Sequence, residues 1–316
     1  MTTSVDSSGQ GTVHVIVTCT NRKTMPAPPA LRLGRASGRT ADEAARVWIT
    51  RISHQNGVPA LPAADLYAGE HWMIARQLPS LAAAGQARLW VCSAGYGLIP
   101  VAARIRPYSV AFSGQQDRVP GGADGARRWW HALSRWEGPE TGHPRSIREL
   151  AAADPSASFM LALSAGYLDA CRDDITAAVT ELPDPDRLLV ISAGARSTGH
   201  MAEVMVPADA RLQAALGGTR QALNARIAAR LLADGLMSRA EATRYLAQLL
   251  AAQPPIPRYA RRPLSDEEVS KMITGRLTHA PALSASMMLR EFRDAGYACE
   301  QQRFARLHRQ AVGSRG

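Results

Sequence analysis

Four short apolar segments, each ending in small polar residues, constrain the fold of this chain more than any other feature. They are Val13–Thr18, Leu89–Ser93, Phe159–Ser164 and Leu188–Ser192. Uninterrupted apolar runs of this length are typical of strands buried on both faces, and amphipathic helical stretches lie between them. Strands that alternate with helices predict an α/β fold, here a doubly wound, mostly parallel sheet flanked by helices.

Several helices are predicted from capping signals and periodicity. Thr40 and Glu43 have the spacing of a capping box, which predicts a helix that ends near His54. Further helices are expected over Ala63–Ala83, over Asp169–Glu181 and, as a pair, over Arg220–Ala252.

Changes in composition divide the chain into four parts. Residues 1–11 are expected to form a disordered tail, residues 12–252 an α/β catalytic domain, residues 253–263 a Pro-rich linker and residues 264–316 a small helical module. The module is basic and contains Arg276, Arg290, Arg293, Arg303, Arg306 and Arg309. Such a module is either a DNA contact of the helix-turn-helix kind or a solvated helical cap on the main domain.

The charge of the chain predicts an acidic partner. There are 37 Lys and Arg residues against 27 Asp and Glu residues, a formal net charge of +10, and only Lys23 and Lys271 are lysines. The arginine bias itself is equally well explained by a GC-rich genome, but the net charge remains. Nucleic acid is the default partner, because neutralising phosphates supplies most non-specific affinity.

Composition also excludes several classes of protein. With 46% hydrophobic and 20% charged residues, the chain is not disordered throughout. No apolar stretch approaches the roughly 18 residues that span a bilayer, and the polar N-terminus does not look like an export signal. Four widely spaced cysteines without a C-x-x-C pair indicate neither a zinc site nor disulfides. We therefore expect a cytoplasmic protein with no metal, cofactor or membrane partner, and its oligomeric state stays open.

The tripeptide Ser-Ala-Gly recurs at three predicted strand ends. The copies are Ser93–Gly95, Ser164–Gly166 and Ser192–Gly194. Parallel strands end at one edge of the sheet, where open α/β folds bind ligands, and small side chains there let the backbone approach a substrate. Ser93, Gly95 and Ser192 are therefore candidate substrate-binding residues. The alternative is that serine and glycine simply terminate strands.

Arginine and tryptophan lie together in the glycine-rich segment Pro107–Pro144, at Arg127-Arg128-Trp129-Trp130. Such a combination suits phosphate contacts and stacking on bases. Arg127, Arg128 and Trp130, together with Arg22 after the first strand, are candidate DNA-binding residues. The alternative for the tryptophans is a helix face that covers the sheet.

Four motifs follow one another between residues 13 and 115. They are Thr18-Cys19-Thr20-Asn21-Arg22-Lys23, Pro62-Ala63-Ala64-Asp65-Leu66-Tyr67, Ser93-Ala94-Gly95-Tyr96-Gly97-Leu98 and Pro107-Tyr108. In order and spacing they resemble the YaaA-like family, which has a Ser-Cys-Ser-x-x-Lys strand end, a Pro-Ala-x-x-Leu-Tyr helix start, a Ser-x-x-Tyr-Gly-Leu strand end and a Pro-Tyr pair. Asn21 departs from that pattern, because the family more often has a basic or small polar residue there.

The resemblance implies action on DNA rather than on small metabolites. The chain looks most like bacterial anti-phage DNA glycosylases, which resemble the uracil-DNA glycosylase superfamily and excise modified bases. It implies hydrolysis of the N-glycosidic bond of a modified base in double-stranded phage DNA, leaving an abasic site in antiviral defence, with glucosylated hydroxymethylated cytosine as one candidate base. The other relatives imply two alternatives, an enzyme that modifies a deazaguanine in DNA and a non-catalytic DNA-binding stress protein.

A glycosylase must hold a water, tolerate a cationic sugar and assist the departing base. Asn21 occupies the place that holds a water-positioning Asp or Asn in the uracil-DNA glycosylase superfamily, and Asp65 is a candidate to activate that water. His200 is a candidate hydrogen-bond donor to the leaving base. The alternatives are a helix N-cap for Asp65 and an ordinary loop histidine for His200.

Five further residues have two interpretations each. Lys23 either attacks the sugar to form a Schiff base or contacts a phosphate. Cys19 is either a nucleophile toward a nitrile-bearing deazaguanine or a small hydrophobe at a strand end. Tyr67, Tyr96 and Tyr108 either stack on an extruded base or belong to the core.

Overall fold

The computed structural model describes residues 11–34, 40–55, 57–82, 87–114, 116–195, 199–255 and 260–313. The chain divides into two units, an α/β unit up to Pro254 and a C-terminal unit from Pro255 onward. All of the predicted N-terminal tail except Gly11, and residues 256–259 of the predicted linker, lie outside the described residues. Within the described ranges, no helix is long and apolar enough to cross a membrane.

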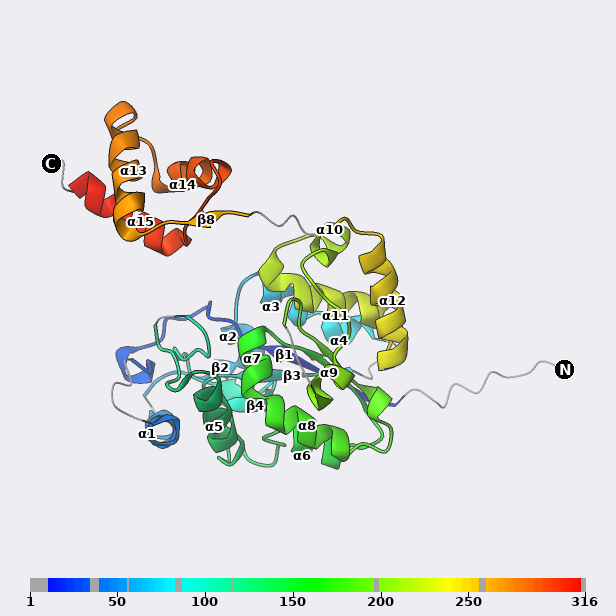
Figure 1. The fold of residues 1–316 in the computed structure, drawn as a ribbon. Helices are drawn as coiled ribbons and strands as arrows, with labels where there is room; N and C mark the ends of the chain where they lie inside the picture. The colour runs from blue at the N-terminus through cyan, green and yellow to red at the C-terminus, as the bar shows by residue number, and fades with distance from the viewer. Residues whose placement is uncertain are drawn as a thin grey trace. The chain divides into compact units, whose positions relative to one another are not determined.

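The α/β unit is built on a sheet of five strands within the described residues, in the order β4-β3-β1-β6-β7 (Figure 1). The strands are β1 (Val13–Thr18), β3 (Ala87–Ser93), β4 (Gly97–Pro100), β6 (Ser158–Ala162) and β7 (Leu188–Ile191). Strands β3, β1, β6 and β7 are parallel neighbours, and β4 is an antiparallel edge strand. The predicted mostly parallel α/β sheet is therefore confirmed, with the four predicted strands adjacent to one another.

The central strand β1 is buried at every position. Its residues Val13–Thr18 pair in register with Ala87–Cys92 of β3, and Val13–Val17 pair with Ser158–Ala162 of β6. A strand with sheet on both sides and helices on both faces has no solvent-exposed face, which explains its nearly continuous apolar run. This burial fixes the place where β1 ends, at Thr18 and Cys19.

Helices cover both faces of the sheet (Figure 1). They are α1 (Ala41–Ser53), α2 (Ala63–Leu66), α3 (Glu70–Ala75), α4 (Leu78–Leu81), α5 (Gly122–Ser134), α6 (Ile147–Ala153), α7 (Ala165–Ala170), α8 (Arg172–Thr180), α9 (His200–Val204), α10 (Leu212–Leu216), α11 (Leu223–Ala233) and α12 (Arg239–Ala251). Helix α5 packs against α1 and α7, and α6 packs against α8, whereas α11 packs against α3 and α4. A short antiparallel pair of strands, β2 (Leu61–Pro62) and β5 (Arg104–Ile105), lies outside the main sheet.

The helix predicted from the Thr40–Glu43 capping box is confirmed, and both hydrogen bonds of the box are present. The single helix predicted over Ala63–Ala83 is wrong, because the chain forms three short helices, α2, α3 and α4. Gly69 before α3 has a φ of 100°, which ends helical geometry there, and Pro79 lies in the first turn of α4. The helix predicted over Asp169–Glu181 is divided between α7 and α8 at Cys171.

The C-terminal unit contains α13 (Asp266–His279), α14 (Ala285–Asp294) and α15 (Gln301–Gly313). A two-residue parallel pair, β8 (Arg262–Pro263) with β9 (Tyr297–Ala298), joins its start to the segment before α15. The three helices enclose a core of their own, made of Leu264, Val269, Ile273, Leu277, Met288, Leu289, Phe292, Cys299, Phe304, Leu307 and Ala311.

His14 is a buried polar residue in the middle of the apolar strand β1. Trp90 Nε1 donates to His14 Nδ1 at 3.0 Å, and His14 Nε2 lies 3.1 Å from Asp154 Oδ2. Because Nδ1 accepts, the proton of the neutral ring is on Nε2, where it is donated to the carboxylate. Burial lowers the pKa of His14 below its ordinary value of 6.5.

We predict that this histidine makes the protein less stable in mild acid. Below about pH 6.5 the unfolded chain protonates His14 while the folded chain does not, so the free energy of unfolding falls as pH falls. The loss is about 1.4 kcal/mol for each unit by which the two pKa values differ. Urea unfolding at pH 8 and pH 5.5 measures it. The variant His14→Gln keeps a donor and an acceptor but does not titrate, and an unchanged pH dependence in this variant would contradict the assignment.

Candidate active site

The order of the strands places a topological switch point at the carboxyl ends of β1 and β6. The chain moves from β1 to β3 on one side and from β6 to β7 on the other, so the connections diverge between β1 and β6. Such switch points are where open α/β sheets bind ligands. Cys19 follows β1, Tyr167 lies on α7 after β6, and the Cys19 Sγ is 2.9 Å from the Tyr167 hydroxyl. Both side chains are half-buried, so this contact is partly accessible to solvent.

A chain of hydroxyl groups continues from Cys19 toward β3. The Tyr108 hydroxyl lies 3.3 Å from Cys19 Sγ, 2.7 Å from Ser93 Oγ and 3.0 Å from the Tyr67 hydroxyl. We call Cys19, Tyr67, Ser93, Tyr108 and Tyr167 the hydroxyl cluster. Burial raises the pKa of all three tyrosines, which keeps their hydroxyls protonated and neutral. The structure thus brings together residues from all four motifs of the sequence.

The rings of the predicted tyrosines are inside the protein. Tyr67 is 2% exposed and Tyr96 and Tyr108 are 1% exposed, which contradicts the stacking role predicted for them and matches the core alternative. The Tyr96 hydroxyl donates to the Arg106 carbonyl at 3.2 Å and accepts from the Arg106 amide at 2.9 Å. The tyrosines therefore position the site through their hydroxyls and do not offer a ring face to a base.

Two loops meet beside the hydroxyl cluster. Lys23 and Tyr67 form an antiparallel bridge, Thr24 N donates to Leu66 O at 2.8 Å, and Ala68 N donates to Arg22 O at 3.0 Å. The loop after β1 is thereby tied to the end of α2. This pairing fixes where each candidate side chain of the two loops lies.

Lys23 points into the protein from this pairing. Its Nζ donates to the Thr20 carbonyl at 3.2 Å and lies 4.2 Å from the centre of the Tyr108 ring. Within the described residues no carboxylate is within ion-pair distance of it, and the side chain is half-buried. Burial lowers the pKa of Lys23, which increases the share of the neutral amine. The Lys23 amine therefore lies beside the hydroxyl cluster and is partly desolvated.

The same pairing separates Asn21 from Asp65. Asn21 lies two residues before the bridge position Lys23, whereas the Asp65 carbonyl accepts from the Thr24 hydroxyl at 2.9 Å, on the other side of that position. In the described part of the chain no hydrogen bond or ion pair joins the two side chains. Both are exposed, and Asp65 is the third residue of α2, whose N-cap is Pro62. The N-cap alternative for Asp65 is therefore wrong.

The structure adds His71 and Tyr167 to the site. His71 Nε2 lies 3.0 Å from the Thr18 carbonyl oxygen, so Nε2 carries the proton, and burial lowers the pKa of this ring. It lies on α3, four residues after Tyr67, where the sequence predicted one longer helix. Tyr167 directly follows the second Ser-Ala-Gly copy, and this position next to a predicted strand end is the sequence signal that indicates it.

Ser192 and His200 lie apart from the hydroxyl cluster. Ser192 is buried after β7, and its hydroxyl has no hydrogen-bond partner in the described part of the chain. His200 begins α9 with its side chain 84% exposed and Nδ1 3.4 Å from Glu203. Across the described ranges no hydrogen bond or ion pair links either residue to Cys19 or Tyr108. The structure does not place them in this site.

The three Ser-Ala-Gly copies have different structural roles. At Gly95 an ideal Cβ atom would lie 2.5 Å from Cδ2 of Tyr108, so glycine is needed for the ring to pack there. Gly166 lies inside α7, and Gly194 has a φ of 80° in a turn. Ser93 accepts from the amides of Gly95 and Tyr96 at 3.3 and 3.1 Å. The repeated tripeptide is therefore not a repeated binding element.

We predict opposite effects for alanine at two of these glycines. Gly95→Ala forces the buried Tyr108 ring to move and should lower the free energy of unfolding by about 1–3 kcal/mol. Gly166→Ala meets its nearest neighbour, Phe112 Cβ, at 3.5 Å and should be neutral or stabilising by up to about 1 kcal/mol, because it lies in a helix. Urea unfolding compares them, and equal effects would contradict the packing role of Gly95.

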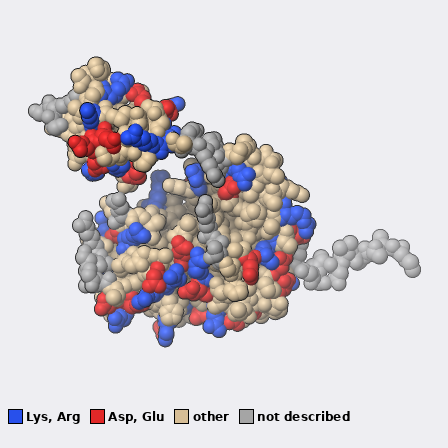
Figure 2. All heavy atoms as spheres, in the orientation of Figure 1, with Lys and Arg blue, Asp and Glu red and all other residues tan. Residues whose placement is uncertain are grey.

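The α5 surface corrects part of the predicted DNA contact. Trp130 is 2% exposed and its Nε1 donates to Asp174, so the predicted stacking role is wrong. Arg127 lies near Asp124 and Asp173, and Arg128 lies near Asp42 and Asp124. Figure 2 shows basic and acidic side chains intermingled on the visible face of the α/β unit.

These pairs line a cavity of about 690 Å³ beside α5, α6 and α8. Arg127 and Arg128 are therefore compensated by carboxylates, whereas Arg22 is exposed in the loop that carries Lys23. Arg22 is the predicted DNA contact that the structure places beside the hydroxyl cluster.

The described residues contain no group of three or more His, Cys, Asp or Glu side chains placed to hold a metal ion. In the comparisons with known proteins, no family model, no curated protein and no solved structure matches the chain. The YaaA-like resemblance and the function it implies stay predictions. The geometry at the switch point is what can support a function.

Proposed function

We propose that this protein is a DNA glycosylase that acts in the cytoplasm on modified bases in double-stranded phage DNA and leaves abasic sites in antiviral defence. The observation that carries the proposal is the position of Lys23. Its half-buried amine lies at the switch point of the sheet, beside Cys19 and the Tyr108 ring and away from carboxylates. An amine with a lowered pKa in such a place is suited to covalent catalysis.

The proposed reaction starts with attack of the neutral Lys23 amine on C1′ of the modified nucleotide. The N-glycosidic bond breaks, and its electron pair leaves with the base, which takes up a proton. The amine–C1′ adduct loses a proton and opens the sugar to a Schiff base. Water then hydrolyses the Schiff base, which returns the amine and leaves the abasic site. These steps balance in atoms and electrons without an oxidant, a metal or a cofactor.

Asp65 and Asn21 support the reaction from the exposed loops on either side of Lys23. The Asp65 carboxylate has no hydrogen bond or ion pair in the described part of the chain, so it is free to take a proton from water. The Asn21 amide is exposed at the other end of the paired loops and is suited to hold the DNA or the sugar. The positive charge of the chain and the exposed Arg22 favour the DNA backbone as the bound surface.

The same site supports one alternative chemistry. The half-buried Cys19 thiol, 2.9 Å from Tyr167, is placed to attack a nitrile-bearing deazaguanine in DNA. That reaction changes the mass of an intact nucleoside, whereas base excision makes strands that break in alkali. A protein that does neither and still binds DNA is the non-catalytic stress protein of the third hypothesis.

We predict that borohydride traps a covalent adduct between the protein and a DNA substrate that contains the modified base. The Schiff base is reduced to a stable amine, and Lys23→Ala should abolish the adduct. Lys271→Ala is the matched control, because Lys271 is an exposed lysine of the C-terminal unit. Adduct formation should rise with pH until Lys23 is deprotonated, because burial lowers its pKa below the ordinary value of 10.5.

Base release with no trapped adduct, unchanged in Lys23→Ala, would contradict the role of Lys23 and leave direct hydrolysis. An adduct that persists in Lys23→Ala would assign the nucleophile to another amine. No base release from any modified phage DNA would overturn the glycosylase itself.

We predict that Asp65→Asn slows hydrolysis of the Schiff base by about 10²-fold, because the carboxylate takes a proton from the attacking water. Lys23 displaces the base before that water attacks, so single-turnover base release by Asp65→Asn should stay near the rate of the unchanged protein. Asn21→Ala should lower base release, because its amide holds the DNA or the sugar. Decay of the adduct that borohydride traps is measured beside base release and DNA affinity, and an unchanged rate of adduct decay in Asp65→Asn would contradict the role of the carboxylate.

A further inference from the structure

Helix α15 differs from the other helices of the C-terminal unit in its charge. Residues Gln301–Gly313 include three arginines and no Asp or Glu, whereas α13 begins with Asp266, Glu267 and Glu268. The buried side of α15, with Phe304, Leu307 and Ala311, packs against α13 and α14. The apolar side of this helix is therefore already used within the unit.

The opposite side of α15 is exposed and carries donors. Gln302, Arg306 and Arg309 follow one another at spacings of four and three residues, which puts them on one face of the helix. All three are exposed. Gln302 and Arg309 have no side-chain partner in the part of the unit that the structure describes. We call these three residues the α15 face.

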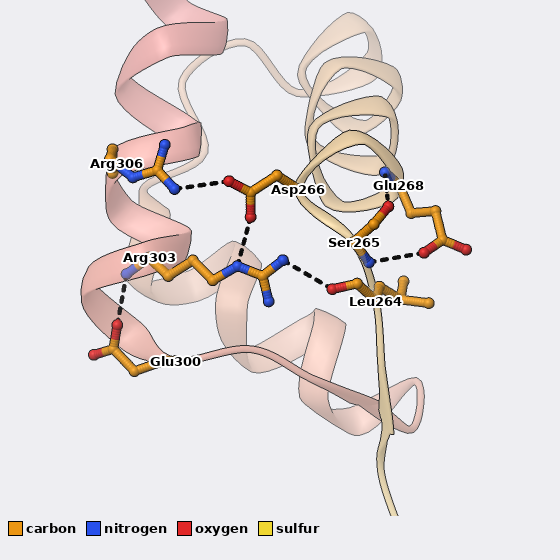
Figure 3. Close-up of polar contacts among 7 residues, drawn as sticks. All are labelled: Leu264, Ser265, Asp266, Glu268, Glu300, Arg303 and Arg306. Carbon is orange, nitrogen blue, oxygen red and sulfur yellow. Dashed lines mark hydrogen bonds and ion pairs between the residues drawn. The ribbon is translucent and has the colours of Figure 1, made fainter.

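Two acidic residues, Asp266 and Glu300, contact α15 (Figure 3). Asp266 accepts from Arg303 Nε at 2.6 Å and from Arg306 at 2.8 Å, and Arg303 also donates to the Leu264 carbonyl at 2.8 Å. Glu300 accepts from the amides of Gln302 and Arg303 at the start of the helix. These contacts tie α15 to the segment before α13 and fix which side it turns outward.

We infer that the α15 face is a second DNA-binding surface that enters the major groove. A helix fits that groove, and arginine and glutamine side chains make paired hydrogen bonds with base edges or contact phosphates. Charge complementarity selects this occupant, because α15 carries three arginines and no Asp or Glu, and Arg309 has no ion-pair partner among the described residues. A membrane does not fit this surface, because the apolar side of α15 is buried within the unit. The inference deepens the proposed function, from which it takes DNA as the partner.

The test measures binding of the full chain to an unmodified 20-base-pair duplex by fluorescence anisotropy at several salt concentrations. Arg309→Gln should weaken binding about tenfold and reduce the salt dependence by about one phosphate contact. Gln302→Ala should weaken binding without changing the salt dependence. Lys271→Gln is the matched control, because it removes one exposed positive charge from α13 in the same unit and should change affinity less than twofold.

Both α15 substitutions are on exposed side chains, and thermal unfolding confirms that the variants stay folded. If Arg309→Gln and Lys271→Gln weaken binding equally, the effect is general charge and the inference is overturned. It is also overturned if Arg309→Gln binds like the unchanged protein. Base release at saturating DNA is measured separately. Its absence overturns the glycosylase alone, while weaker binding by Arg309→Gln still supports the α15 face.

Discussion

The contact between the Ser93 hydroxyl and the Tyr108 hydroxyl, at 2.7 Å, is the interaction on which the candidate site depends. Ser93 ends β3 and is fully buried, so its hydroxyl needs partners from the protein. It obtains them from Tyr67 after α2, from Tyr108 after β5 and from the turn amides of Gly95 and Tyr96. Segments far apart in the sequence are thereby held around one buried oxygen.

The position of Lys23 follows from this packing. The Tyr108 ring that contacts Ser93 also provides the surface under the Lys23 amine. A cation over an aromatic ring gains up to about 2 kcal/mol when desolvated, whereas removing an ammonium from water costs several kcal/mol. Burial lowers the pKa of Lys23, and its effect is larger than that of the neighbouring Cys19, which raises the pKa. The packing that holds the two loops together therefore also desolvates the amine.

Sequence patterns predicted the elements whose formation depends on residues close together in the chain. The four parallel strands were predictable because strands buried on both faces are apolar throughout, and α1 because Thr40 and Glu43 form both bonds of its capping box. The convergence of Cys19, Ser93 and Tyr67 was predictable because parallel strands end at one edge. The separation of Asn21 from Asp65 was not, because it depends on the register of the bridge between Lys23 and Tyr67, which no local pattern encodes. His71 was missed because Gly69 reorients the chain between the two short helices.

The distribution of arginines shows why net charge alone does not locate a DNA surface. Arg127, Arg128 and Arg309 are all arginines on helices. The first two have aspartates of α1, α5 and α8 around them, so a phosphate approaching them also meets carboxylates. Arg309 is on a helix without any acidic residue and has no ion pair among the described residues, whereas Arg306 on the same helix is paired with Asp266 at 2.8 Å. Because interactions between exposed charges fade over about 10 Å at ordinary salt, an arginine without a carboxylate partner attracts a polyanion more strongly than one that already has such a partner.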